Sequence, residues 1–271
     1  MNAAELEQGL GCAQAIAAAA QVRVNTDFRV TESRLKGDGS DITDTDLHIE
    51  RLAADRIRAA FPQHALLAEE AVAQPEDMPA PADARYCWVI DPLDGTRNYA
   101  RGLACFTTSI ALLDEGVPVV ALIRDLVTGA DYSAVAGQPA RCGTRRMAVT
   151  QRPLDRSAVV TFQPAGDGST YDRAPWVRRV HVRNFGTTAL HLALLADGCV
   201  DGSLCEQNRI WDVAAGALLV QQAGGVITRM DGAELTPFDL STDPRGELAF
   251  LAGSPETHAA LLDGTVSGGS G

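Results

Sequence analysis

The sequence predicts a mixed α/β protein built from two lobes. An alanine-rich, proline-free stretch over residues 3–22 predicts an N-terminal helix. Strand-like runs without long helices over residues 86–136 predict an antiparallel sheet, whereas strand and helix patterns alternate after about residue 150. We therefore expect a first lobe at residues 1–150, a second lobe at 151–264, and a flexible glycine- and serine-rich tail at 265–271.

The first half shows a second helix and a series of short strands. Thr45 and Asp46 can cap this helix, which carries an apolar stripe and ends at Phe61-Pro62. Continuous or alternating apolar runs bounded by turn residues predict the strands. These runs cover residues 65–68, 86–90, 105–113, 117–123 and 130–136.

The second half alternates between the two kinds of element. Helices are expected at residues 187–196, 212–223 and 255–262, and the second of them ends at Gly224-Gly225. Strands are expected at residues 157–162, 180–183, 199–204, 226–228 and 248–251.

The composition narrows the classes of function. The chain has 23 Lys+Arg against 35 Asp+Glu, a formal charge of −12, which argues against a nucleic-acid binder and permits divalent cations. No run approaches the ~18 apolar residues of a membrane span, and the N-terminus lacks the features of a signal peptide, so we expect a cytoplasmic protein. The six cysteines form no C-x-x-C motif and are expected to be reduced thiols.

The most informative segment is Asp91-Pro92-Leu93-Asp94-Gly95-Thr96, which follows the apolar run that ends at Ile90. Two carboxylates this close repel each other unless a cation or a proton lies between them. The Leu93 carbonyl is a further hard oxygen, and Mg²⁺ suits such a set of ligands. The Gly95 and Thr96 amides can receive phosphate oxygens. The alternative is an aspartate-rich capped turn.

Three other segments carry charged residues that could contribute to the same site. Glu69-Glu70 leave the end of a predicted strand, where the alternative is a surface acid pair. Asp212 begins an apolar helix, where the alternative is an acid stabilised by the helix dipole. Lys36 and Asp46 bracket a polar stretch, which is otherwise a charged hairpin followed by a helix cap.

Together these segments resemble the inositol monophosphatase family of metal-dependent phosphatases. Trp88-Val-Ile-Asp91-Pro-Leu-Asp94-Gly-Thr96-Arg-Asn98-Tyr is similar to the first family signature, W-[IV]-[IV]-D-P-[IL]-D-G-T-x-N-[FY]. Trp211-Asp212-Val-Ala-Ala-Gly216, with Ala223-Gly224-Gly225, is similar to the second, W-D-x-A-A-G…A-G-G. The segment from Lys36 to Asp46 resembles the K-x-D-G-S-x-V-T-x-x-D element, and Ala68-Glu69-Glu70 resembles G-E-E with alanine in place of glycine.

The resemblance implies a fold and a metal site. The fold is the layered α-β-α-β-α sugar-phosphatase fold, with an antiparallel sheet in the first lobe, a mixed sheet in the second, and a homodimer as the assembly. One Mg²⁺ is expected on Glu69, Asp91 and the Leu93 carbonyl, and a second on Asp91, Asp94 and Asp212. A weaker third ion is expected near Glu69, and Mn²⁺ can replace Mg²⁺.

The implied reaction is hydrolysis of a small phosphate monoester by a metal-activated water molecule. Glu69 and the Thr96 hydroxyl are expected to orient and deprotonate the water, with Asp46 hydrogen-bonded to Thr96. Lys36 is expected to place positive charge just outside the metal ligands. Asp94, Gly95 and Thr96 are expected to contact the phosphate.

The second lobe is expected to bind the alcohol part of the substrate. Gly186-Thr187-Thr188-Ala189 resembles the family's G-[ST]-A-A segment, with Thr188 where alanine is usual, and Thr187 can alternatively cap a helix. Glu206 resembles the glutamate that accepts hydrogen bonds from inositol hydroxyls, although its spacing to Asp212 is one residue shorter than in the inositol enzymes.

Several readings of the function stay open at this level. Inositol monophosphate or a similar polyol or sugar phosphate is the first expected substrate, before histidinol phosphate, fructose 1,6-bisphosphate and 3′-phosphoadenosine 5′-phosphate. A regulatory protein that binds the transcription machinery is the alternative from another class. A basic cluster is either a solvated strand face or a patch for a second anionic group of the substrate; it comprises Arg173, Arg178, Arg179 and Arg183.

Overall fold

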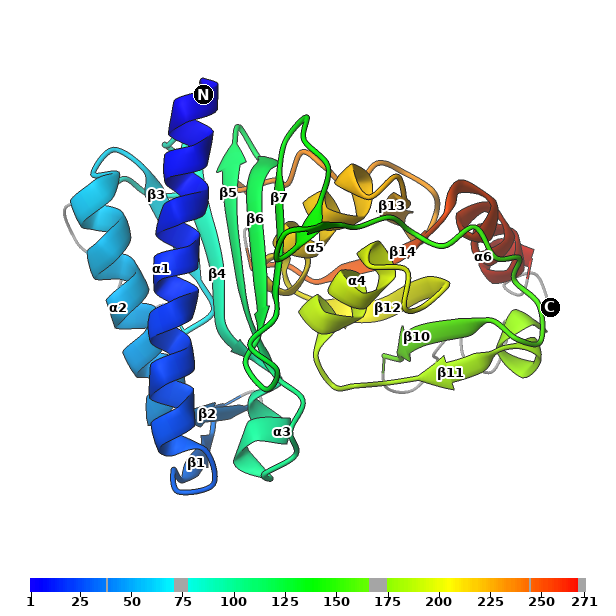
Figure 1. Ribbon diagram of the computed structural model, residues 1–271, viewed down its shortest axis with the longest axis horizontal. Helices are drawn as coiled ribbons and strands as arrows, with labels where there is room; N and C mark the ends of the chain where they lie inside the picture. The colour runs from blue at the N-terminus through cyan, green and yellow to red at the C-terminus, as the bar shows by residue number, and fades with distance from the viewer. Residues whose placement is uncertain (38, 71–77, 166–174, 244, 268–271) are drawn as a thin grey trace.

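The computed structural model describes residues 1–37, 39–70, 78–165, 175–243 and 245–267 (Figure 1). Two large β-sheets and three layers of helices alternate through the described part of the molecule. This α-β-α-β-α arrangement is the architecture that the sequence predicts. Within the described residues, no helix is both long and apolar enough to cross a membrane.

The larger sheet has seven strands in the order β3-β4-β5-β6-β7-β8-β9. Its strands are β3 (Ala65–Ala68), β4 (Tyr86–Asp94), β5 (Thr107–Asp114), β6 (Val117–Asp125), β7 (Asp131–Val135), β8 (Arg141–Cys142) and β9 (Arg145–Arg146). All neighbours are antiparallel except β3, which pairs parallel with β4. The predicted antiparallel sheet is therefore confirmed, with one parallel pair added at its edge. A parallel pair needs a long connection between its strands, and residues 69–85 provide one here.

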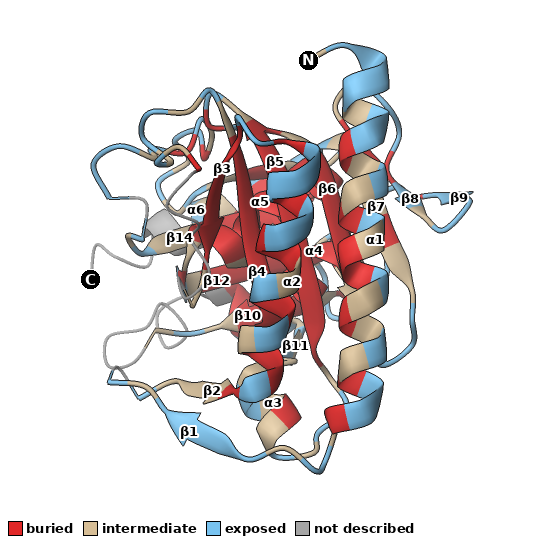
Figure 2. Cartoon of the chain, turned by 90° about the vertical axis from the view of Figure 1, so that its left-hand side faces the viewer, coloured by how far each residue is buried: buried red, intermediate tan, exposed pale blue. Residues whose placement is uncertain are grey.

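Two long helices cover the outer face of this sheet: α1 (Ala3–Asp27) and α2 (Asp44–Ala60). Their buried stripes face the sheet and their exposed stripes face solvent (Figure 2). The cap of α2 is Thr43 rather than Thr45, since Asp46 at the third helical position accepts a hydrogen bond from the Thr43 amide (2.8 Å) and completes a capping box.

The smaller sheet has five strands in the order β11-β10-β12-β14-β13. Its strands are β10 (Val159–Gln163), β11 (His181–Arg183), β12 (Gly202–Asn208), β13 (Val226–Arg229) and β14 (Leu248–Gly253). β10 lies parallel to β11 and β12, whereas β14 is antiparallel to both its neighbours, which confirms a mixed sheet. β12 extends four residues beyond the predicted end at 204, because its pairing with β14 resumes after a bulge at Asn208.

Two apolar helices fill the space between the sheets: α4 (Thr188–Ala196) and α5 (Ile210–Gln222). Both contribute to one continuous core with residues of both sheets, so the two predicted lobes bury their apolar side chains together. On the far side of the smaller sheet lie α6 (Pro255–Ser267) and the 3-10 helix η2 (Pro175–Arg179).

Two smaller elements and the chain end complete the fold. The short strands β1 (Ser33–Leu35) and β2 (Asp41–Thr43) form a ribbon beside the short helix α3 (Thr96–Ala100) (Figure 1). The helix α6 continues to Ser267, which includes the first three residues of the expected tail, and residues 268–271 lie outside the described residues.

Candidate active site

A cavity of about 260 Å³ opens where β3, β4, α3, α5 and the end of β10 meet. Five carboxylates contribute to its lining: Asp41, Glu69, Asp91, Asp94 and Asp212. Its other lining residues are Ser40, Leu93, Gly95, Thr96, Arg97, Gln163 and Gly186. The cavity therefore gathers every residue that the sequence predicts to bind metal.

A β-bulge brings the carboxylates of Asp91 and Asp94 together. In a regular strand, residues three apart point to opposite faces of the sheet. Here Asp91 pairs with Ser109 and Asp94 with Thr107, so β4 holds one more residue than β5 between the two pairs, which brings both side chains to one face. Pro92 suits this break, because proline has no amide to donate to the ladder.

Asp212 joins this pair from the first turn of α5. It is the third residue of the helix, and its Oδ2 accepts a hydrogen bond from the Arg209 amide (2.8 Å). Carboxylate oxygens of Asp91, Asp94 and Asp212 lie within 4.8 Å of one another. Asp212 is thus confirmed as a helix-start acid, and its position in the first turn of α5 directs its carboxylate to Asp91 and Asp94.

The three carboxylates lie in surroundings that disfavour their negative charge. Burial raises the pKa of Asp91 well above its ordinary value, and the charges of Glu69, Asp94 and Asp212 raise it further. Burial raises the pKa of Asp94 to about 7 and also raises that of Asp212. A bound cation or shared protons relieve this repulsion. The all-oxygen ligand set fits Mg²⁺ or Mn²⁺.

The second half of the chain holds the other side of Asp94. Its Oδ2 accepts hydrogen bonds from the Thr187 hydroxyl (2.6 Å) and the Ala189 amide (2.7 Å), both at the start of α4. The Thr187 hydroxyl also accepts a hydrogen bond from the Leu190 amide (3.4 Å), so its role as a helix cap is confirmed. The sequence pattern identified Thr187 but did not reveal its bond to Asp94.

Thr96 and Asp46 meet as expected beside the cavity. The Thr96 hydroxyl lies 2.9 Å from Asp46 Oδ1 and 2.8 Å from the Leu93 carbonyl oxygen. Burial raises the pKa of Asp46 to about 6, although hydrogen bonds from Thr43 and Thr96 oppose the shift. Gly95 starts α3 with φ of +95°, and a Cβ there would lie 3.0 Å from the Cys105 carbonyl oxygen, so only glycine fits.

Glu69 lies at the rim of the cluster beside a lysine. Lys36 Nζ lies 2.8 Å from Glu69 Oε1 and 2.9 Å from Glu70 Oε1. Burial lowers the pKa of Lys36, but the charge and hydrogen bond of Glu69 outweigh it, so the net pKa is raised and the ammonium stays charged. The expected positive charge outside the acids is thus present, and it contacts Glu69 directly.

Only one of the residues expected to bind the alcohol part of the substrate lines the cavity. Gly186 lines the cavity, whereas Thr187 and Thr188 are buried behind it, and the Thr188 hydroxyl donates to Asn208 Oδ1 (2.6 Å). Glu206 lies on β12 and accepts a hydrogen bond from the Ala165 amide (2.9 Å).

Four cavity residues were missed by the sequence reasoning: Ser40, Asp41, Arg97 and Gln163. Gln163 ends β10, and a polar residue directly after an apolar strand is the signal that identifies Glu69 and Asp91 as well. Arg97 occupies the variable position of the first signature and donates from Nε to Asp41 Oδ2 (3.0 Å) and from Nη2 to the Gly39 carbonyl (3.0 Å).

The predicted basic cluster lies away from this cavity. Arg178 and Arg179 are on η2 and Arg183 is on β11; all three are exposed, and none of them lines the cavity. Arg173 lies outside the described residues.

Comparisons with known proteins identify relatives of this chain. Residues 3–263 match the inositol monophosphatase family. The probable inositol 1-monophosphatase ImpA of Mycobacterium tuberculosis is 33% identical over 250 residues, which cover 86% of this chain and 84% of that protein. The Nus factor SuhB of Escherichia coli K12 is 35% identical over 231 residues, which cover 82% of this chain and 85% of that protein. The solved structure of inositol monophosphatase from Anabaena (Nostoc) sp. PCC 7120 covers 97% of each chain with a TM-score of 0.81 and 30% identity.

Proposed function

The chain belongs to the inositol monophosphatase family, and we propose that this Mg-dependent phosphoric monoester hydrolase cleaves inositol monophosphate or a similar small polyol or sugar phosphate. The observation that carries the proposal is the group of Asp91, Asp94 and Asp212, with carboxylate oxygens within 4.8 Å of one another. A dianionic phosphate approaches such acids only when cations lie between them.

The metal ligands in this proposal are the carboxylates of Asp91, Asp94 and Asp212, together with Glu69 and the Leu93 carbonyl. They would hold two Mg²⁺ ions, with a weaker third near Glu69, and Mn²⁺ as a substitute. When bound, such ions neutralise the charge of the phosphate and lower the pKa of a water molecule. The raised pKa values of the three aspartates support this assignment, because a bound cation would relieve the repulsion between their charges.

The remaining cavity residues would align the water molecule and the phosphate. Glu69 accepts a proton from the water molecule, and the Thr96 hydroxyl, held by Asp46 at 2.9 Å, orients it. The backbone amides of Gly95 and Thr96 lie at the start of α3, where no side chain caps the helix, and would donate hydrogen bonds to phosphate oxygens. Lys36 holds the Glu69 carboxylate at the edge of the cavity through a contact of 2.8 Å.

The substrate's alcohol would lie between Gly186 and Gln163, which line the other side of the cavity. We assign Thr187 and Thr188 to the support of this wall, since both hydroxyls are bonded to buried side chains. Glu206 would reach the hydroxyls of a larger substrate. We also propose a homodimer in the cytoplasm, and light scattering of the purified protein tests its mass.

The decisive experiment is phosphate release from a panel of esters, with Mg²⁺ and with EDTA. The panel contains inositol 1-phosphate, histidinol phosphate, fructose 1,6-bisphosphate and 3′-phosphoadenosine 5′-phosphate, and the Asp94→Asn variant is the control. Mg-dependent release from inositol 1-phosphate above the other esters is expected. Absence of release from every ester, or full activity in Asp94→Asn, contradicts the proposal.

A second function is favoured by one comparison. A relative with 35% identity bears the name Nus factor, so we propose transcription-complex binding as the alternative. Co-purification with RNA polymerase that is unchanged in Asp94→Asn would support this role. Failure to co-purify under conditions in which the catalytic activity is intact removes it.

A further inference from the structure

Arg245, in the segment between β13 and β14, links the two elements that deliver Glu69 and Asp212. Its Nη1 donates to the Glu69 carbonyl (2.9 Å) and its Nη2 to the Ala68 carbonyl (2.8 Å). Its Cζ lies 5.2 Å from the ring centroid of Trp211, the residue before Asp212. One planar cation thus binds the end of β3 and stacks on the start of α5.

The position of Glu69 depends on contacts of this kind because β3 is the edge strand of its sheet. On the paired side, the Glu69 amide donates to the Ile90 carbonyl (3.2 Å). Edge strands leave backbone groups without a sheet partner. Arg245 satisfies two carbonyls at the point where β3 ends and the side chain of Glu69 leaves toward the cavity.

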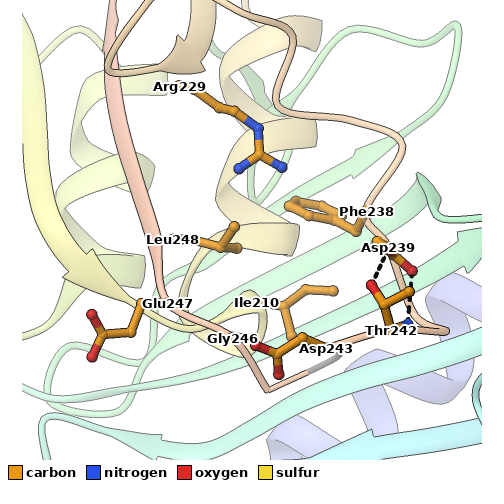
Figure 3. A pocket seen from close by; sticks show the side chains of 9 residues that line it. All are labelled: Ile210, Arg229, Phe238, Asp239, Thr242, Asp243, Gly246, Glu247 and Leu248. Atoms are coloured by element: carbon orange, nitrogen blue, oxygen red, sulfur yellow. Dashed lines mark hydrogen bonds between the residues drawn. The ribbon is translucent and has the colours of Figure 1, made fainter.

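The segment that carries Arg245 is not closely packed on the residues beneath it. A second cavity of about 200 Å³ lies beside this segment, and Arg229 on β13 points into it (Figure 3). The residues of the segment that line it are Phe238, Asp239, Thr242, Asp243, Gly246 and Glu247. A further polar contact of this segment is the hydrogen bond from Gln207 Nε2 to Glu247 Oε1 (2.8 Å). Because a cavity lies beneath the segment, we infer that the hydrogen bonds of Arg245 set the distance between the segment and β3.

We propose that Arg245 is a positioning residue for metal binding, which holds Glu69 and Asp212 at the separation that a pair of neighbouring ions requires. The proposal rests on the proposed function, because it assumes that Glu69 binds one of these ions and Asp212 the other. Arg245 does not line the catalytic cavity, so its loss acts on metal binding and turnover more than on the KM of the substrate.

The test measures metal binding apart from catalysis. Mn²⁺ binding to purified Arg245→Ala, Arg245→Lys and Arg229→Ala is followed by the electron paramagnetic resonance signal of the free ion, and kcat and KM are measured in parallel. Arg245→Ala is expected to bind Mn²⁺ about ten-fold more weakly than wild type, with a similar loss in kcat. Arg245→Lys is expected to fall between the two, because an ammonium cannot bond both carbonyls and stack on Trp211 as a planar fork does.

Arg229→Ala removes the guanidinium that points into the second cavity, and this variant should bind Mn²⁺ as wild type does. Wild-type Mn²⁺ affinity in Arg245→Ala, or an equal loss in Arg229→Ala, overturns the proposal. If circular dichroism shows Arg245→Ala to be unfolded, Arg245→Lys is judged by the same criterion. A wild-type protein that binds no Mn²⁺ and releases no phosphate contradicts the proposed function instead.

Discussion

The hydroxyl of Thr187 donates a hydrogen bond of 2.6 Å to Oδ2 of Asp94, across 93 positions of the chain. This contact joins the start of α4 to the end of β4. Asp94 is therefore oriented by the second half of the molecule, although it is the last residue of a strand of the first half. Groups that orient a metal ligand in this way affect metal affinity strongly.

Replacing Thr187 with valine should weaken metal binding while the side chain keeps its shape. Without the donated hydrogen bond, the carboxylate of Asp94 loses one partner that favours its ionised form. The Mg²⁺ concentration for half-maximal activity should rise about ten-fold. Thr187→Ser, which retains the hydroxyl, should restore it to near the wild-type value. An unchanged Mg²⁺ requirement in Thr187→Val would show that the bond does not orient the ligand.

Replacing Asp212 with asparagine should abolish turnover without destabilising the metal-free protein. The amide oxygen can still accept the bond from the Arg209 amide, whereas one negative charge leaves a buried, mutually repelling group. We expect kcat to fall by orders of magnitude. In EDTA, the Tm from differential scanning calorimetry should be equal to or above that of wild type. A Tm several degrees lower would argue against charge repulsion in the cluster.

The pH dependence of stability should contain a contribution from His191. This buried imidazole accepts a hydrogen bond from the Phe185 amide (2.9 Å), and burial lowers its pKa to about 4. Between pH 6.5 and 4 the unfolded chain takes up a proton that the folded chain refuses, so stability falls as the pH falls. At pH 5 the loss is of the order of 2 kcal/mol.

Calorimetry of His191→Gln tests this contribution. The drop in Tm between pH 7 and pH 5 should be smaller than in wild type, because the amide does not titrate in that range. His181→Gln, at an exposed position of β11, should keep the wild-type drop. An equal drop in all three proteins would assign the acid sensitivity to other groups.

Replacing Arg183 with alanine should leave substrate binding unchanged. Its side chain is exposed on β11, its Nη1 donates to the Val182 carbonyl (2.9 Å), and it does not line the cavity. The KM values for a monophosphate and for a bisphosphate should each stay within about two-fold of wild type, in line with the small effects of surface substitutions. A rise confined to the bisphosphate would restore the second-anion reading of the basic cluster.

The local elements follow from the sequence because their signals are local. The apolar run before Asp91 predicts β4, and the apolar run after Asp212 predicts α5; both elements are present. The direction of β3 was not predictable in this way, since parallel and antiparallel strands have the same alternation along the chain. The bulge between Asp91 and Asp94 was also not predictable from the sequence, because it is defined by the pairing of β4 with β5.

The sequence by itself determined the layered α/β fold, the family, and the acidic residue types that a metal-dependent phosphatase needs. Periodicity and spacing are properties of neighbouring residues, and the signatures lie within short segments. Only the tertiary structure decided that Thr187 supports Asp94, that Thr188 is turned toward Asn208, and that Arg245 spans Ala68 and Trp211. These contacts join segments far apart in the chain, and their geometry depends on how the two sheets pack against α4 and α5, which no local pattern encodes.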